Sequence, residues 1–301
     1  MHNHLYADKM RDYLRLHFVV FLWGFTSILG NLITLTGLEL TIWRTMLAAI
    51  GMAIYMRFKK LSFRISGEGL LKIMGTGAIV GAHWVCFFHA AKIATVSVCL
   101  AGVATTAIFV LFLESWLMKV RISKMNFLMS ILGVWGLYLI FKFEFSYWEG
   151  LIISLIAAFL SALFGVFNAL WVRQYPAHVI TLYEMISASF FTWLAYILTE
   201  KRVTFLPIPA PTDWIYLLIL AWVCTVYAFF ESTELLNRLS SFVINLYLNL
   251  EPVYGMLLAI LIFQENRKMT SAFYAGMAII LISVMLYPIS QYVRKKRAHC
   301  S

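Results

Sequence analysis

A carboxyl group in the middle of a long apolar segment is the first feature of this sequence that could do chemistry. Glu251 lies twelve residues from either end of the segment 239–263, and Pro252 follows it directly. A proline inside a helix removes a backbone donor, which frees a carbonyl group near Leu248 and kinks the chain. A free carbonyl beside a buried carboxylate could bind a substrate amine or a proton. The alternative is that Glu251 is protonated or paired and Pro252 only shapes a packed helix.

Helical geometry predicts which neighbours share a face with Glu251. Tyr247 and Tyr254 fall on its face, whereas Asn249 is turned about 200° away at about 100° per residue. We expect the face with the tyrosines and the glutamate to line a substrate path. Asn245 and Asn249 are expected to form hydrogen bonds between helices.

A second candidate face lies on the apolar segment 69–91, where His83 and Trp84 share a stripe with further aromatic residues. An imidazole at membrane depth favours a wet cavity and could relay protons, so His83 joins Glu251 as a candidate for proton coupling. The alternative for the stripe is packing against lipid or other helices. The substrate-binding candidates are Glu251, Tyr254, Tyr247, His83, Trp84, Trp23 and Tyr227.

Five further charged residues lie within one or two turns of the end of an apolar segment, where side chains can reach the membrane surface. They are Arg44, Glu114, Glu184, Glu231 and Glu234. For each of them we favour this interfacial position over a direct role in substrate binding.

Motifs for catalysis, metal binding and nucleotide binding are absent from the sequence. It has no phosphate-binding P-loop, no Ser/His/Asp set and no cluster of metal ligands, and its seven histidines are scattered. We therefore predict no enzyme activity, no cofactor and no metal.

The composition predicts where these residues are held. Of 301 residues, 62% are hydrophobic and 13% are charged, against about 45–50% and about 25% in soluble domains. Such a chain cannot cover its apolar surface with polar residues, so the excess must face lipid. A net charge of +10 would suggest nucleic acid in a soluble domain. In a membrane protein the same excess orients the chain, and we expect no nucleic-acid partner.

Hydropathy predicts ten membrane spans, because one crossing needs roughly 20 apolar residues. With the N-terminus inside, 17 of the 24 basic residues fall on the cytoplasmic side. This bias predicts a multi-pass protein of the bacterial cytoplasmic (inner) membrane with both termini cytoplasmic. The spans cover approximately residues 15–35, 40–57, 69–91, 96–118, 125–142, 148–171, 178–199, 212–234, 239–263 and 271–290.

The two halves of the chain align with each other at a nearly constant offset. Leu22–Phe25 aligns with Leu163–Val166 at an offset of 141, and Lys92–Phe112 aligns with Asn237–Leu257 at 145. Because each half holds five spans, the second half enters the membrane upside down relative to the first. Inverted repeats of this kind are the architecture of secondary transporters.

The predicted fold is therefore an all-α integral membrane protein, with ten transmembrane helices as two inverted five-helix repeats. The first repeat covers residues 1–145, and the second covers 146–301 and ends in a basic cytoplasmic tail. Arg44 and Glu184 occupy matched positions, yet the inversion turns them toward opposite faces, so we expect no salt bridge between them. We assign structural roles to Pro252, Gly24, Gly165, Gly77 and Gly81, since small residues let membrane helices approach closely.

An ordered set of short motifs accompanies this pattern. They are Trp23-Gly24, Trp43-Arg44 with Leu47-Ala48, Phe87 to Lys92 continuing to Val96-Ser97-Val98, Asn249 to Gly255, and Glu265. Over essentially its whole length the chain resembles the EamA-like ten-helix branch of the drug/metabolite transporter superfamily. It departs from the pattern at Ala107 and Val120, where a proline and a terminal glutamate are usual. The resemblance implies movement, mostly export, of small polar metabolites such as amino acids.

The hypothesis that follows is a secondary transporter that exports a small polar metabolite by alternating access, in exchange for protons. The expected partners are a small-molecule substrate and the lipid bilayer, and the sequence leaves monomer or homo-oligomer undecided. A facilitative uniporter or channel-like permease would share the composition but needs no titratable group at the midplane. An intramembrane enzyme or a lipid scramblase is less favoured, because the short loops leave little room for a catalytic face.

Overall fold

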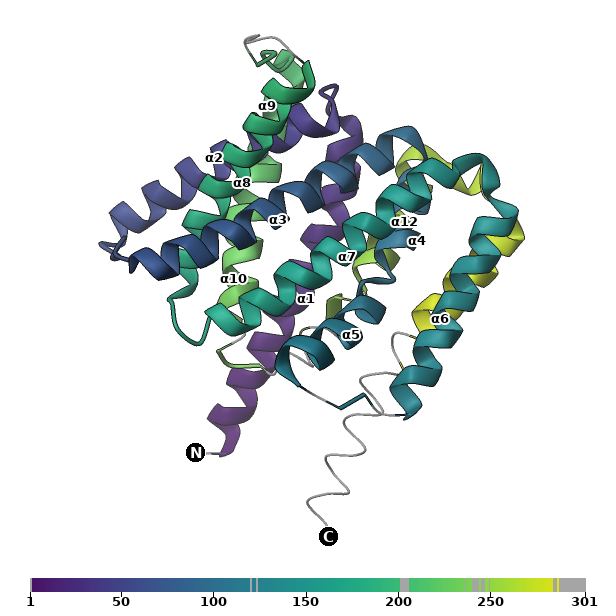
Figure 1. The fold of residues 1–301 in the computed structure, drawn as a ribbon, viewed down its shortest axis with the longest axis horizontal. Coiled ribbons are helices and arrows are strands. Elements are labelled where there is room, and N and C mark those ends of the chain that lie inside the picture. Colours follow the sequence, from purple (N-terminus) through teal and green to yellow (C-terminus); the bar gives the residue numbers. More distant parts are fainter. Residues whose placement is uncertain are drawn as a thin grey trace.

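The computed structural model of the chain is all-helical (Figure 1). It describes residues 2–119, 121–122, 124–200, 206–235, 237–239, 244, 247–248, 250–283 and 286, and these include no β-strand. Among the described residues, seven helices are long and apolar enough to cross a membrane. Three shorter apolar helices are Phe127–Phe143, Glu251–Phe263 and Ser271–Ser283. The predicted all-α class is confirmed. Asn245, Asn249, Val120 and the basic tail lie outside the described residues.

The helices follow the predicted spans closely where the chain is described, except that α1 begins well before residue 15. In the first half they are α1 (His2–Leu32), α2 (Gly37–Phe58), α3 (Gly67–Ile93), α4 (Val96–Val103), α5 (Thr106–Met118) and α6 (Lys124–Phe143). In the second half they are α7 (Trp148–Trp171), α8 (Ala177–Glu200), α9 (Pro211–Leu218), α10 (Ala228–Leu235), α12 (Glu251–Phe263) and the helix Ser271–Ser283. A π-helix, Ile219–Tyr227, joins α9 to α10, and short 3-10 turns cover Phe145–Tyr147 and Glu265–Arg267.

Side-chain oxygens satisfy the first backbone N–H groups of several helices, as helix N-termini require. The Thr95 hydroxyl accepts a hydrogen bond from the Val98 N–H at 3.1 Å and caps α4. The Glu265 carboxylate reaches the same turn from the second half of the chain. It accepts from the N–H groups of Val96 at 2.9 Å and Ser97 at 2.8 Å. A carboxylate at a helix N-terminus also complements the helix dipole, so Glu265 ties α4 to the end of α12.

Two apolar segments are interrupted near their middle. The segment Val96–Met118 was predicted as one span, but it breaks at Ala104 and Thr105, between α4 and α5. The Gly102 carbonyl accepts from the Thr105 hydroxyl at 2.7 Å and from the Thr105 backbone N–H at 3.1 Å, so both groups close a tight turn at the break. In the second half a turn at Leu250 precedes α12. The two breaks stand at positions that the 145-residue offset aligns.

Helices of the two halves interleave instead of forming separate bodies. α3 packs against both α7 and α8, α2 packs against α8, and α1 packs against α12. Figure 1 shows α3 and α7 side by side along much of their length. Glycines allow the closest approaches: a Cβ atom at Gly77 would lie 2.6 Å from the Glu184 carbonyl oxygen, and one at Gly81 would lie 3.2 Å from Ala188.

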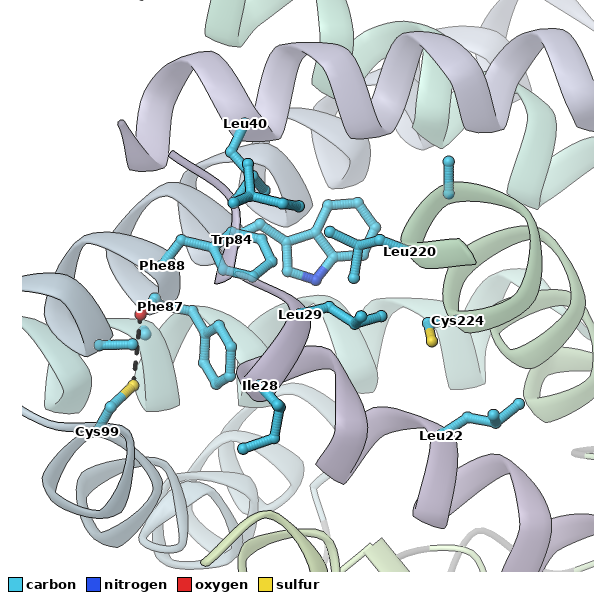
Figure 2. Close-up of a cluster of buried hydrophobic side chains, with 14 of the residues drawn as sticks. Leu22, Ile28, Leu29, Leu40, Trp84, Phe87, Phe88, Cys99, Leu220 and Cys224 are labelled. Atoms are coloured by element: carbon cyan, nitrogen blue, oxygen red, sulfur yellow. Dashed lines mark hydrogen bonds between the residues drawn. The ribbon is translucent and has the colours of Figure 1, made fainter. Parts of the chain in front are cut away.

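The largest cluster of buried apolar side chains lies where α1, α2, α3, α4 and the π-helix meet (Figure 2). Phe88 and Leu100 are completely buried in it, and Trp84 is 6% exposed. The Cys99 thiol donates to the Phe87 carbonyl oxygen at 3.4 Å, which satisfies the polar atom that α4 brings into this cluster. The cluster fixes the face of α3 on which Trp84 lies.

Candidate functional site

A cavity of about 190 Å³ lies between helices of the two halves. Both interrupted segments reach it, through Ala104 and Thr106 in the first half and through Leu248 and Pro252 in the second. Charged and aromatic side chains on its wall include Trp23, Arg44, His83, Trp84, Phe87, Glu114, Phe164, Phe229 and Glu251. Interrupted helices that meet a central cavity at matched positions are where membrane transporters hold their substrates.

Four of the predicted substrate-binding residues line this cavity together. They are Glu251, His83, Trp84 and Trp23, and Pro252 lies beside them. Glu251 is the first residue of α12 and is partly exposed to the cavity. Within the described part of the chain, its carboxylate has no ion-pair partner, since the pairs there are Arg15–Glu231, Lys72–Glu68 and Arg238–Asp12.

His83 is 8% exposed, and a backbone carbonyl holds its ring. Nδ1 lies 2.8 Å from the Ala157 carbonyl oxygen on α7. Because a carbonyl only accepts, Nδ1 carries the proton in this bond and Nε2 is left as the acceptor of a neutral ring. The ring also meets Phe164 edge-on, with 5.4 Å between the centroids. His83 therefore has a fixed orientation on the cavity wall.

The three predicted tyrosines lie elsewhere and are not among the described residues that line the cavity. The Tyr254 hydroxyl lies 2.6 Å from Nε2 of His17 on α1. Tyr247 stacks on Tyr13 with 6.0 Å between the ring centroids, and Tyr227 is 40% exposed. Their predicted role in substrate binding stays a prediction.

Close packing of α1 explains where Tyr254 points. A Cβ atom at Gly24 would lie 2.8 Å from Cβ of Tyr254, so the backbone of α1 covers that side of α12. The ring can then only turn along α1 toward His17, while Glu251, one turn earlier, stays on the cavity side. The shared face predicted from helical periodicity is thus divided by a neighbouring helix.

Arg44 is the functional candidate whose position the sequence did not reveal. We expected its side chain at the membrane surface, and this is wrong, because the residue is 1% exposed and lines the cavity. Its guanidinium carbon lies 3.9 Å from the centroid of the Trp84 ring. Its Nε donates to the Thr225 hydroxyl at 2.8 Å. A usable signal was its depth, since seven residues of α2 precede it and span about 10 Å.

Glu184 also departs from the expected surface position, because it is completely buried. Asn168 on α7 donates to one of its carboxylate oxygens at 3.3 Å, and the close contact at Gly77 covers it from α3. Arg44 and Glu184 form no salt bridge with each other. Glu231, in contrast, pairs with the partly exposed Arg15 at 3.3 Å, which agrees with a position near the surface.

The site thus combines one cation, Arg44, and two carboxylates, Glu251 and Glu114, with aromatic walls. Arg44 and Glu251 both line the cavity, and no hydrogen bond or ion pair joins them in the described structure. An unpaired charge in the membrane interior is costly. A bound solute with complementary charges would lower that cost.

Several apolar helices long enough to span a membrane and a charged cavity between the two halves are features of the membrane transporter class. The chain belongs to the EamA-like transporter family, whose model matches residues 13–142 and 148–287. The resemblance noted from the motifs is confirmed. A transporter family is coarsely consistent with the predicted lack of enzyme activity, and the apolar helices agree with a multi-pass membrane protein.

Two known proteins are similar to the chain. An uncharacterized transporter of Synechocystis sp. is 27% identical over 192 residues, which are 60% of this chain and 54% of that protein. The chain therefore spans about half the length of this curated relative. A crystal structure with 15% sequence identity superposes with a TM-score of 0.65 over 91% of this chain and 97% of that chain. At this identity the similarity shows a shared fold.

Proposed function

We propose that this protein is a secondary active transporter that exports a small polar metabolite, such as an amino acid or a related compound, in exchange for protons. The observation that carries the proposal is the pair of unpaired charges, Arg44 and Glu251, in a cavity between the two halves. A solute bound there is enclosed by helices from both halves, so opening either side in turn gives alternating access.

The proposed architecture is ten transmembrane helices arranged as two inverted repeats, residues 1–145 and 146–301. Support comes from the two separate family matches, 13–142 and 148–287, and from the aligned breaks in the two interrupted segments. The location proposed is the bacterial cytoplasmic membrane with both termini cytoplasmic. It is supported by the 17 of 24 basic residues that this orientation places inside.

Glu251 is the proposed proton-coupling group, with His83 as a second candidate. A carboxyl group that lines the cavity without a fixed cation can take a proton when the solute leaves and release it when a solute amine binds. Such an exchange couples the two flows, because one group cannot hold both ligands at once. His83 faces the same cavity with a fixed ring, so it could pass protons to and from Glu251.

The test is flux in proteoliposomes that contain the purified protein. The twenty common amino acids serve as labelled solutes, and uptake is measured with and without a pH gradient. Glu251→Gln should abolish flux driven by the gradient and spare exchange of solute for solute, since an amide can bind but cannot carry a proton. Glu149→Gln is the matched control, because Glu149 is exposed at the start of α7.

Each outcome of this experiment has a defined meaning. If none of the twenty amino acids shows saturable flux, the transporter proposal is rejected for this substrate class. Driven flux that survives Glu251→Gln would remove the proton role of that residue. Flux that persists with both Glu251 and His83 neutralised would identify a facilitative uniporter.

A further inference from the structure

Arg44 is a buried cation whose hydrogen-bonding capacity is mostly unused. A guanidinium group has five N–H donors. In the described structure only Nε has a partner, the Thr225 hydroxyl at 2.8 Å, and Nη1 is buried without one. Buried donors are normally satisfied, because leaving one unpaired costs as much as its lost hydration. Donors left open on a cavity wall indicate a ligand that completes them.

Two contacts hold the guanidinium group in a fixed orientation. The Trp84 ring lies 3.9 Å from the guanidinium carbon, a distance at which a cation is attracted to the ring face. Thr225 lies in the π-helix, and its hydroxyl donates to the Leu220 carbonyl oxygen at 2.7 Å, five residues back. That bond leaves the hydroxyl oxygen free to accept from Arg44. π-helical turns often occur at functional sites, and here the turn presents the oxygen that orients the arginine.

No carboxylate among the described residues forms an ion pair with Arg44, although Glu251 lies near enough to interact with its charge. The ion pairs of the described residues all lie elsewhere, and the two carboxylates on the cavity wall, Glu251 and Glu114, form none with it. We infer that Arg44 binds the carboxylate of the transported solute, and that the solute is a small zwitterion with an apolar side chain. The inference rests on the proposed function and names the substrate class of the same cavity.

The charges on the cavity wall favour a carboxylate over a phosphate. Among the described lining residues, Arg44 carries the permanent positive charge, whereas Glu251 and Glu114 are acidic. A doubly charged phosphate would meet more repulsion than attraction there. A single carboxylate matches the planar fork of an arginine, and an ammonium group on the same solute matches Glu251.

The size and the walls of the cavity restrict the rest of the solute. The cavity, of about 190 Å³, has room for a small metabolite. Phe87, Phe164 and Phe229 line the cavity beside the charged groups. Aromatic walls bind an apolar side chain and reject a second charged one.

The first experiment is a binding series on the wild-type protein in detergent. The probes are L-leucine, L-methionine and L-phenylalanine, each compared with its carboxamide and with the amine that lacks the carboxyl group. Affinity is measured by competition and by the rise in Tm on binding. We expect at least one acid to bind, at least tenfold more tightly than its amide and its amine. Equal affinities, or binding by none of the three acids, would overturn the proposal.

The second experiment locates the effect at Arg44. Arg44→Gln should lower the affinity for the acid at least tenfold and leave the affinity for its amide unchanged, so the preference disappears. Arg44→Lys keeps the charge and should retain part of the preference for the acid over its amide. Arg173→Gln is the matched control, because Arg173 is exposed at the end of α7. Equal loss of acid and amide binding in Arg44→Gln would mean a structural role and would overturn the proposal.

The substrate class and the transporter role can be rejected separately. If solutes without a carboxyl group show saturable flux in proteoliposomes and the acids do not bind, the substrate class is wrong and the transporter proposal stands. If Arg44→Gln does not fold, the wild-type series still decides, because it needs no variant.

Discussion

The contact between α1 and α12 beside Glu251 gives the sharpest prediction for stability. A Cβ atom at Gly24 would lie 2.8 Å from Cβ of Tyr254, 2.9 Å from the Gly255 nitrogen and 3.1 Å from the Glu251 carbonyl oxygen. Gly165, its partner at the 141-residue offset, has no atom within 4 Å of the same position. Gly24→Ala and Gly165→Ala are therefore the same chemical change at matched positions, one crowded and one open.

These distances set the free-energy cost of Gly24→Ala. Ordinary contact begins at 3.4 Å, so Gly24→Ala must separate two helix backbones by about 0.6 Å. Overpacking of this kind costs about 1–3 kcal/mol. Both variants gain about 0.5–1 kcal/mol because alanine loses less backbone entropy than glycine. The difference between them isolates the overpacking cost, with Gly24→Ala the less stable.

The assay is thermal unfolding of both purified variants in one detergent at one scan rate, because Tm depends on scan rate when unfolding is irreversible. A change of 1 kcal/mol shifts Tm by about 2–4 °C in a protein of about 150–250 residues and by less in a longer one. We expect Gly24→Ala to melt several degrees below Gly165→Ala. Equal Tm values for the two variants would refute the close contact between α1 and α12.

The hydrogen bonds of Glu265 to α4 and of Thr225 to Arg44 position the site, and each can be removed by one substitution. Glu265→Gln should lower Tm by several degrees, because it removes the charge from two hydrogen bonds to the first turn of α4. Each such bond stabilises the fold by about 1.5–3 kcal/mol when the acceptor is charged. An unchanged Tm would mean that this cap contributes nothing to stability. Thr225→Val keeps the side-chain shape but leaves Nε of Arg44 without its acceptor. It should weaken acid binding and spare amide binding, and equal weakening of both would contradict the positioning role.

Hydropathy predicted the helices well because a membrane crossing has a fixed length. The span predicted at 148–171 coincides with α7, Trp148–Trp171. The break in the fourth span was not predictable in the same way. It falls at Ala104 and Thr105, in an apolar segment without proline, where the Thr105 hydroxyl and backbone N–H both bond to the Gly102 carbonyl. Hydropathy averages over such single bonds.

The site was predictable in part for a similar reason. Glu251 is far from either end of its apolar segment in any plausible register, so its depth could be predicted from the sequence. The depth of Arg44 could be read from its place in α2, but the orientation of its side chain could not, because the Thr225 hydroxyl that holds it is 181 residues away in the chain. Tyr254 shares a helical face with Glu251 by periodicity, yet contact with Gly24 turns its ring aside. Side-chain direction at a helix crossing is set by the partner helix.

The interleaving of the two halves has a consequence for how motion could be observed. Glu265 holds the first turn of α4, and α3 packs against both α7 and α8, so residues 1–145 and 146–301 cannot swing apart as two pieces. The helices that pack against one another are mixed, with α2, α3 and α8 in one group and α1, α4 and α12 in another, and we expect the two groups to move as blocks. Pairs of spectroscopic labels should report the transport cycle when they compare these two blocks. Pairs chosen by sequence half alone would often sit within one block and record almost no change in distance.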